Sequence, residues 1–486
     1  MRARSSQPPA SLSRRVGVNT ASQIAARLYS SALAFAITAL LLPRRLDVAD
    51  FGLFAFYLTL YQLLQNVLDF GAGTIVIREA SRDRERAGRL IGLLIGLKAR
   101  LALAAIGALL GVAWVFEGGS ARTALLVVAS LHLLAHAPSA AGAIFSVDMA
   151  FARANLASAL GQTVWLAATV LLIVAGVLEP SVYLMAFGLG AATGGLLTWA
   201  WARRRVAIRH DGTAAERAAL WTDAWPAGVS MTMASVYFYI DAVLLRPLLG
   251  EVAVAHYSVA YRLMGFVLMV PVLFSQVVFP VFSRLWPAGA LDPFFQRTTG
   301  LLAGFGLLFP PLIWLLRADL MALVYPPDYA PGAESLGILS LAIPIVFAAY
   351  PHVLTLLAAG EQRLMMGIST AGAVLNVGLN LWWVPALGIE GAAWATVATE
   401  AFVLGSAALA VRRRARLAFR PRALARPALC GGLATLALWA LLGGLDTQAV
   451  ALRCAAGIGL GAVAALCAGL LPLRLEPPEP APAGGP

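Results

Sequence analysis

The sequence predicts an all-α polytopic membrane protein with about 14 transmembrane helices, and two observations support that prediction. First, 60% of the 486 residues are hydrophobic and only 12% are charged, with a mean hydropathy of +0.80. Second, the apolar residues form continuous stretches of about 20, the length that crosses a hydrocarbon core roughly 30 Å thick. Stretches such as Leu301 to Leu316 lack the alternation of barrel strands, so we expect helices to satisfy the backbone in lipid.

The predicted spans follow one another with short connections. They cover residues 16–42, 51–71, 90–115, 122–140, 155–178, 181–201, 225–246, 253–275, 297–316, 333–358, 364–384, 388–410, 427–445 and 449–471. The first span is too long to be the apolar region of a cleaved signal peptide, so we expect it to be retained. Residues 472–486 are rich in Pro, Gly and Ala and are predicted to be disordered.

The distribution of positive charge predicts the orientation of the spans. With the N-terminus placed in the cytoplasm, 28 of the 36 lysines and arginines fall in cytoplasmic segments or their helix ends, and 6 fall in outer loops. Positive residues concentrate on the cytoplasmic side of membrane proteins. The sequence therefore predicts a multi-pass protein of the bacterial inner membrane with both termini in the cytoplasm.

Several classes of function lack their characteristic features in this chain. The longest connection, about Ala202 to Ala224, is too short for a soluble catalytic domain, and no phosphate-binding glycine loop occurs. The charges flank the spans, which argues against nucleic-acid binding. His132 and His136 share a helix face, but packing is the favoured interpretation because further metal ligands are missing. We therefore predict a protein that is not an enzyme, with no catalytic residue, metal or cofactor.

An internal repeat predicts the organisation of the domains. The segment from Leu41 to Ala55 aligns with the segment from Leu244 to Ser258 at an offset of 203 residues, which places six spans between equivalent positions. The predicted parts are a basic tail (1–15), an N-terminal lobe (16–201), a cytoplasmic linker (202–224), a C-terminal lobe (225–410), two further helices (427–471) and the tail (472–486).

Four groups of residues, spread over positions 20 to 410, resemble the motifs of a known family. They are Leu40 to Gly52 with Leu68-Asp69-Phe70-Gly71 and Arg78-Glu79; Trp225 to Gly228 with Tyr239-Ile240-Asp241 and Tyr257 to Arg262; Phe279 to Ser283; and Asn376, Asn380, Pro385 and Leu387 to Thr396. The chain thus resembles the polysaccharide-biosynthesis flippases of the multidrug/oligosaccharidyl-lipid/polysaccharide exporter superfamily.

The resemblance implies two six-helix lobes around a central cavity, two C-terminal helices and transport by alternating access. It also implies a substrate made of sugars on a polyprenyl pyrophosphate, for cell-surface polysaccharide biosynthesis. The expected partners are this lipid-linked oligosaccharide, membrane lipids and glycan polymerases or glycosyltransferases, and the protein itself is expected to be a monomer.

Two arginines are the predicted ligands of an anionic substrate head. Arg27 and Arg262 lie deep in their spans, where ionisable groups are costly and are functional candidates by default. The guanidinium group offers paired donors that match a pyrophosphate and does not lose its charge. The alternative for Arg262 is a structural ion pair with Asp241 on the preceding span.

The remaining candidates are acidic or amide side chains. Asp241 and Glu400 are predicted either to bind a coupling proton or cation or to have a structural role. Asn376 and Asn380 share a helix face and are predicted to bond across helices or to contact sugars.

Two other classes of function compete with the flippase. A cation-coupled multidrug exporter of the same fold needs carboxylates within the N-terminal lobe, whereas the one deep charge predicted there is Arg27. A membrane-embedded glycan polymerase or ligase needs sizeable outer loops with a nucleophile and a base, and the outer loops here are short.

Overall fold

The structure is a computed structural model that describes residues 9–148, 150–444 and 449–468. All regular structure in these ranges is helical, and 14 helical segments are long and apolar enough to cross a membrane, which confirms the predicted fold class. The predicted tail 472–486 lies outside the described residues, as do the first eight residues of the predicted basic tail.

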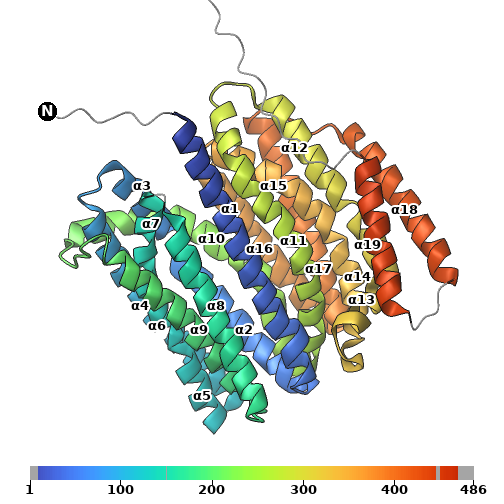
Figure 1. The fold of residues 1–486 in the computed structure, drawn as a ribbon, viewed down its shortest axis with the longest axis horizontal. Helices are drawn as coiled ribbons and strands as arrows, with labels where there is room; N and C mark the ends of the chain where they lie inside the picture. The colour runs from blue at the N-terminus through green and yellow to red at the C-terminus, as the bar shows by residue number, and fades with distance from the viewer. Residues whose placement is uncertain (1–8, 149, 445–448, 469–486) are drawn as a thin grey trace, which may run out of the picture. The chain divides into compact units, whose positions relative to one another are not determined.

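The α-helices run in this order (Figure 1): α1 Pro9–Phe35, α2 Val48–Asp69, α3 Ala72–Arg82, α4 Ala87–Glu117, α5 Ala121–Ser130, α6 His132–Ser139, α7 Ala143–Val147, α8 Phe151–Val174, α9 Pro180–Ala202, α10 Ala214–Leu249, α11 Glu251–Leu285, α12 Leu291–Gly306, α13 Phe309–Val324, α14 Gly332–Ser340, α15 Ala342–Ala358, α16 Gln362–Leu387, α17 Ile389–Arg414, α18 Ala425–Gly444 and α19 Val450–Cys467. A π-helical turn, Ala36–Leu41, extends α1.

The chain divides into two units, Met1–Ser235 (unit 1) and Val236–Pro486 (unit 2). Unit 1 holds the first six candidate spans, and the division falls inside α10. Because α10 begins at Ala214, it starts within the segment 202–224 that was predicted as a linker.

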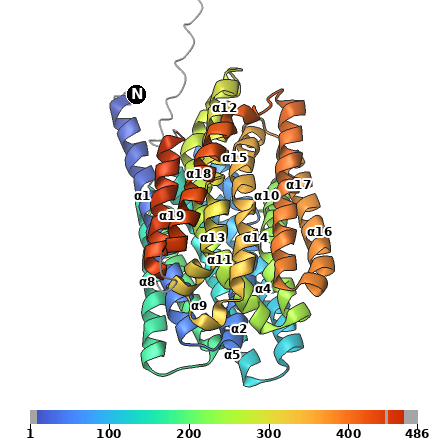
Figure 2. The same cartoon turned by 90° about the vertical axis from the view of Figure 1, so that its right-hand side faces the viewer.

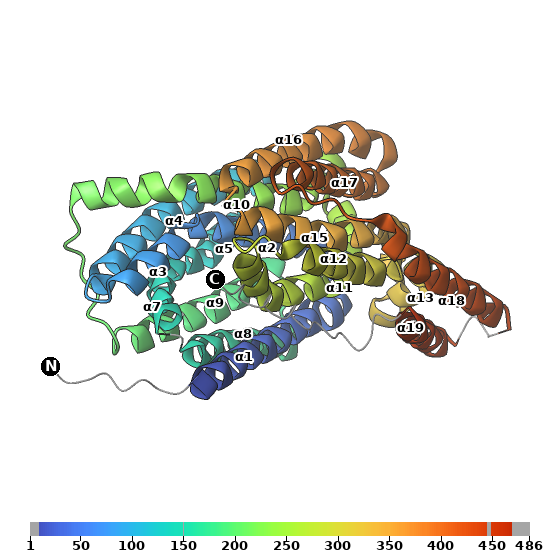
Figure 3. The same ribbon diagram turned by 90° about the horizontal axis from the view of Figure 1, so that it is seen from above.

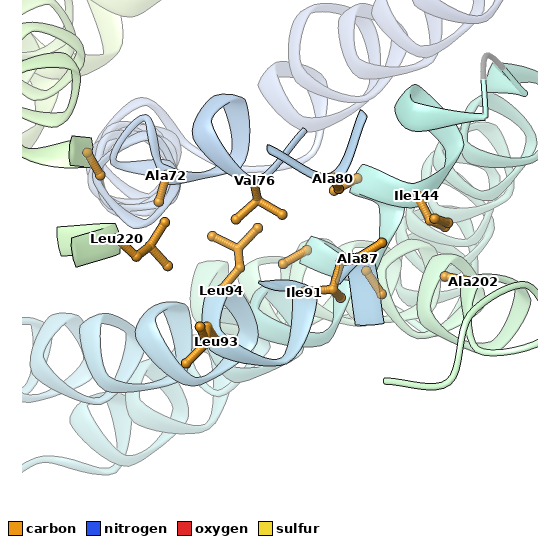
Figure 4. Packing of buried hydrophobic residues seen from close by; sticks show 14 of the residues in the cluster. Ala72, Val76, Ala80, Ala87, Ile91, Leu93, Leu94, Ile144, Ala202 and Leu220 are labelled. Carbon is orange, nitrogen blue, oxygen red and sulfur yellow. The ribbon is translucent and has the colours of Figure 1, made fainter. Parts of the chain in front are cut away.

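A short amphipathic helix covers part of the core of unit 1. Ala72, Val76 and Ala80 recur every four residues on α3, which places them on one helix face. Figure 4 shows Val76 directed towards Leu94 of α4, and all four side chains are nearly inaccessible. The opposite face of α3 carries arginines, so it suits a position at the polar edge of the membrane.

The turn between α2 and α3 is held in an unusual conformation. Phe70 and Gly71 both have left-handed backbones, with φ of 36° and 64°, and this costs a residue with a side chain about 1–2 kcal/mol. The Phe70 ring stacks on Trp221 of α10, with centroids 5.0 Å apart and planes inclined by 9°. This stacking packs the first half of α10 against the turn.

Close helix contacts shape the rest of unit 1. A Cβ atom added to Gly161 of α8 would lie 2.6 Å from the Gly190 carbonyl oxygen of α9, and one added to Gly190 would lie 2.6 Å from the Gly161 oxygen. Small residues at such crossings let helices approach closely in membranes. On its other side α8 lies along α1 (Figure 3), where the Tyr29 hydroxyl hydrogen-bonds Thr163 at 2.9 Å.

An ion cluster at one end of unit 1 joins α5 to the start of α9. Arg122 donates two hydrogen bonds to Glu179, at 3.1 and 3.2 Å. Partial burial by itself would raise the pKa of the Glu179 carboxyl, but hydrogen bonds from Arg122 and Ser181 outweigh it and lower the pKa.

Unit 2 ends in a helix pair that packs on α13. Figure 2 shows α18 and α19 side by side next to α13. Arg453 of α19 pairs with Asp319 of α13 at 3.2 Å, and both side chains are largely buried. This ion pair ties the final two spans to the rest of unit 2.

Candidate functional site

Two tight helical hairpins bring four polar side chains of unit 2 to the same depth. α10 and α11 are joined by Gly250 alone, and α16 and α17 by Gly388 alone, with φ of 86° and 67°. Asp241 and Tyr257 stand nine and seven residues from Gly250, and Asn380 and Thr396 each stand eight residues from Gly388. At about 1.5 Å per helical residue, all four lie roughly 10–14 Å from the turns, towards the middle of a membrane.

Asp241 is the centre of a hydrogen-bonded cluster at that depth. One carboxylate oxygen accepts from the Tyr257 hydroxyl at 2.8 Å and also from the Thr396 hydroxyl. The other oxygen accepts from the Asn380 side-chain amide at 2.7 Å. Asn376, one turn before Asn380, accepts from the same amide through its own side-chain oxygen at 3.2 Å. Asp241, Asn376 and Asn380 are each at most 2% exposed.

The cluster contains no balancing positive charge. No lysine, arginine or histidine forms an ion pair with Asp241 in the part of the chain that the structure describes, so only neutral groups surround the carboxylate. A buried charge without a counter-charge is costly even when it is hydrogen-bonded. Two amide atoms, Asn376 Nδ2 and Asn380 Oδ1, are also buried without a protein partner. The arrangement favours uptake of a proton or a small cation.

Glu400 lies one helical turn beyond Thr396 on α17 and is half-buried. It stands within electrostatic range of Asp241 and of two tyrosines, Tyr237 and Tyr261. The predicted acidic pair therefore lies in one region of unit 2, with tyrosine hydroxyls around it.

The two predicted arginines lie apart from this cluster. Arg262 is half-buried on α11 and forms no ion pair with Asp241 among the described residues, so the alternative structural pairing is not formed. Arg27 is an exposed side chain on α1 of unit 1. Neither guanidinium is paired with a carboxylate within the described ranges.

Sequence reasoning missed a charged cluster in unit 1. Lys98 was counted with the cytoplasmic arginines, but it lies on α4 within a candidate span and is only 6% exposed. Its ammonium group binds the Asp69 carboxylate at the end of α2, and the same oxygen accepts from His136 Nε2 of α6 at 3.3 Å. Arg27 is therefore not the only deep charge of the N-terminal region. The depth of Lys98 in its span was the available signal.

Tyr257 and Thr396 were also missed as site residues, although both belong to the motifs of the resemblance. Their similar distances from the hairpin glycines, seven residues for Tyr257 and eight for Thr396, were the sequence signal that places them beside Asp241. No group of three or more His, Cys, Asp or Glu side chains that would hold a metal ion occurs among the residues described.

Two family profiles match the chain. The profile of the polysaccharide biosynthesis protein family covers residues 16–286, which is more than half of the chain, and the MatE profile covers residues 226–382. No curated protein sequence matches.

Solved structures of two kinds of transporter share the fold. The lipid II flippase MurJ in an inward closed conformation aligns with a TM-score of 0.74 at 15% identity, over 91% of this chain and 97% of its own. An inward-facing multidrug resistance MATE family transporter aligns with a TM-score of 0.62 at 16% identity, over 81% of this chain and 98% of its own. A mutant of the Vibrio cholerae MATE transporter VcmN gives 0.56 at 15% identity, over 84% and 98%.

The profile match establishes the family, and the shared fold agrees with it. Both confirm the resemblance drawn from the sequence motifs. The chain therefore belongs to the polysaccharide biosynthesis protein family, within the multidrug/oligosaccharidyl-lipid/polysaccharide exporter superfamily of membrane transporters and flippases.

Proposed function

We propose that the chain is a flippase that moves a polyprenyl-pyrophosphate-linked oligosaccharide across the bacterial inner membrane by alternating access. The family and the fold support a transporter or flippase, and a similar structure is described as a lipid II flippase. The proposed cargo feeds cell-surface polysaccharide biosynthesis, so glycosyltransferases and a glycan polymerase are its expected partners.

The observation that carries the proposal is the pair of arginines without carboxylate partners. Arg27 and Arg262 carry permanent positive charge on helices that cross the membrane, and neither charge is balanced by an ion pair in the described residues. An uncompensated charge at such depth is costly, which makes a functional role the default interpretation. A pyrophosphate supplies the missing negative charge and accepts paired hydrogen bonds from each guanidinium.

We further propose that Asp241 and its neighbours hold the coupling ion. The carboxylate has hydrogen-bond donors but no counter-charge, so a proton or a monovalent cation lowers the cost of its burial. Glu400, within electrostatic range, is the second candidate for the same role. Asn376 and Asn380 then act as positioning residues for this ion rather than as contacts for sugars.

The function is tested with purified protein in vesicles that contain a fluorescent polyprenyl-pyrophosphate oligosaccharide. A membrane-impermeant glycosidase added outside reports how fast labelled lipid reaches the outer leaflet. We expect wild type to accelerate this exposure, and Arg27→Ala and Arg262→Ala each to reduce it at least 10-fold, about 1.4 kcal/mol. Arg27→Lys and Arg262→Lys should lose less, because they keep the charge but not the paired donors.

Arg204→Ala is the matched control, since Arg204 is an exposed arginine outside the spans and should leave the rate unchanged. Equal rates for wild type and protein-free vesicles would overturn the proposal. The MatE profile over residues 226–382 supplies one specific competitor, an exporter of cationic compounds. Efflux of a cationic dye without movement of the labelled lipid would favour that exporter.

A further inference from the structure

Unit 1 contains a polar cavity that neither the substrate nor the coupling proposal uses. Its volume is about 190 Å³, and α2, α6, α8 and α9 contribute its lining. Glycines and an alanine of α8 and α9 form part of the lining, and its polar side chains include Gln65, His132, His136, Ser158 and Gln162. This space is large enough for several water molecules at about 30 Å³ each. The Gln162 side-chain oxygen is buried and has no protein partner, which suits a hydrated cavity.

Two histidines, one helical turn apart on α6, line this cavity and have different hydrogen-bond partners. His132 Nδ1 lies 2.7 Å from the Ala129 carbonyl oxygen, so Nδ1 must carry the hydrogen. His132 Nε2 lies 3.1 Å from the Gln65 side-chain nitrogen, which donates to it. An added proton on Nε2 would face that donor, so both ring nitrogens of His132 are occupied and the ring is held neutral.

His136 differs because its Nε2 faces an acceptor, whereas the Nε2 of His132 faces a donor. Its Nε2 faces the Asp69 carboxylate at 3.3 Å and therefore donates a hydrogen there, while no partner of Nδ1 is found in the described part of unit 1. Asp69 is shared with the ammonium group of Lys98. With neutral His136, the charges of Lys98 and Asp69 cancel. With protonated His136, the additional charge lies directly against the same carboxylate. Neither state leaves an isolated buried charge.

We propose that His136, Asp69 and Lys98 form an exchangeable proton-binding site in unit 1, with His136 as the residue that takes up the proton from water in the cavity. The other ionisable groups on the packed elements do not compete. α9 carries only Tyr183, which is bonded to the Val177 carbonyl oxygen, and α8 carries only Arg153, an exposed residue. On α2, Tyr61 donates to Leu126 O.

The site is tested directly by NMR on full-length protein in lipid nanodiscs with ¹⁵N-labelled histidine. The chain has only five histidines, so His136→Gln and His132→Gln identify the two signals. We expect the nitrogen signals of His136 to change with pH and those of His132 to stay those of a neutral ring. Asp69→Asn should move the midpoint of the change in the His136 signal to lower pH, and Lys98→Met should move it to higher pH. In each variant the proton concentration at the midpoint should change at least tenfold.

A His136 signal that does not change with pH, or that is the same in both variants as in wild type, would overturn the proposal. If Asp69→Asn does not fold, Lys98→Met alone decides the matter. A second experiment rests on the proposed function and uses the vesicle assay. The rate of lipid exposure should depend on pH in His132→Gln, as in wild type, but not in His136→Gln. Absence of lipid movement in wild type would defeat the flippase assignment, while the NMR titration would still decide the proton site.

Discussion

Each unit contains a polar cluster around one aspartate, but the charge of that aspartate is compensated differently in the two units. In unit 1, Asp69 is half-exposed and lies between Lys98 and His136, so its charge is balanced by basic groups. In unit 2, Asp241 is 2% exposed and has only hydroxyl and amide donors. The comparison indicates that the negative charge of Asp69 is balanced by basic side chains of the protein. The negative charge of Asp241 is balanced only when a proton or a cation is added.

The backbone accounts for part of this difference. The unit 2 cluster is built from two hairpins, each turned by one glycine, which fix four side chains at one depth. The unit 1 cluster depends on the strained turn at Phe70, which ends α2 directly after Asp69 and leaves that carboxylate near the helix end. The carboxylate of Asp241 is therefore buried, whereas that of Asp69 is half-exposed.

The largest effect is expected at Asp241. Asp241→Ala removes one acceptor from each of the Tyr257, Thr396 and Asn380 donors, and a buried donor left unsatisfied costs about 1–3 kcal/mol. We expect Asp241→Ala to lower thermal stability sharply and abolish lipid exposure in vesicles. Asp241→Asn keeps the shape and should fold, but its transport should no longer respond to the ion gradient. A wild-type response to that gradient in Asp241→Asn would contradict the proposed role.

The next largest effect is expected at the ion pair of Asp69 and Lys98 in unit 1, where losing either residue should change stability by a different amount. Asp69→Asn leaves the buried Lys98 ammonium without its counter-charge and should cost about 3 kcal/mol of unfolding free energy. Lys98→Met should cost less, because Asp69 is half-exposed and keeps His136. Thermal unfolding in detergent measures both. The double variant should recover most of the loss, and simple additivity would show that the pair is not coupled.

The smallest effect concerns the hairpin that sets the depth of Asn380 and Thr396. A Cβ atom at Gly391 would lie 2.4 Å from the Trp383 carbonyl oxygen, so Gly391→Ala should cost about 2 kcal/mol. Gly378→Ala, on the open side of α16, meets no atom within 4 Å and should gain up to about 1 kcal/mol. Thermal unfolding of the two alanine variants compares them. Equal stabilities would mean that the close approach of α16 and α17 (Figure 2) is not maintained.

The fold was predictable from the sequence because the signals are local. Apolar stretches of membrane-crossing length gave all 14 spans. The one-residue turns were not predicted, because Gly250 was placed in a longer connection and Gly388 inside a span. The start of α10 at Ala214 was missed because its first turns are polar and were assigned to the linker. The predicted orientation of the termini remains a prediction.

The site was only partly predictable, because its contacts join distant segments. Its position in a span selected Asp241, and a shared helix face selected Asn376 and Asn380; the structure brings all three together. The partner of Asp241 was not predictable, since Arg262 is close in sequence whereas Thr396 is 155 residues away. Lys98 was missed because a nearby run of arginines made it look like a flanking charge. Roles of Arg27, Arg262 and Glu400 remain proposals.

The one-glycine turns also determine how this protein is best handled in the laboratory. A protease, an inserted epitope tag or an antibody needs several extended residues to engage, and Gly250 and Gly388 leave no such stretch between their helices. Reporter tags for mapping the membrane orientation should therefore be inserted in the connection between α9 and α10 or near Arg416, where the backbone runs outside regular helices. The same compactness makes the two hairpins poor targets for antibodies raised against short peptides.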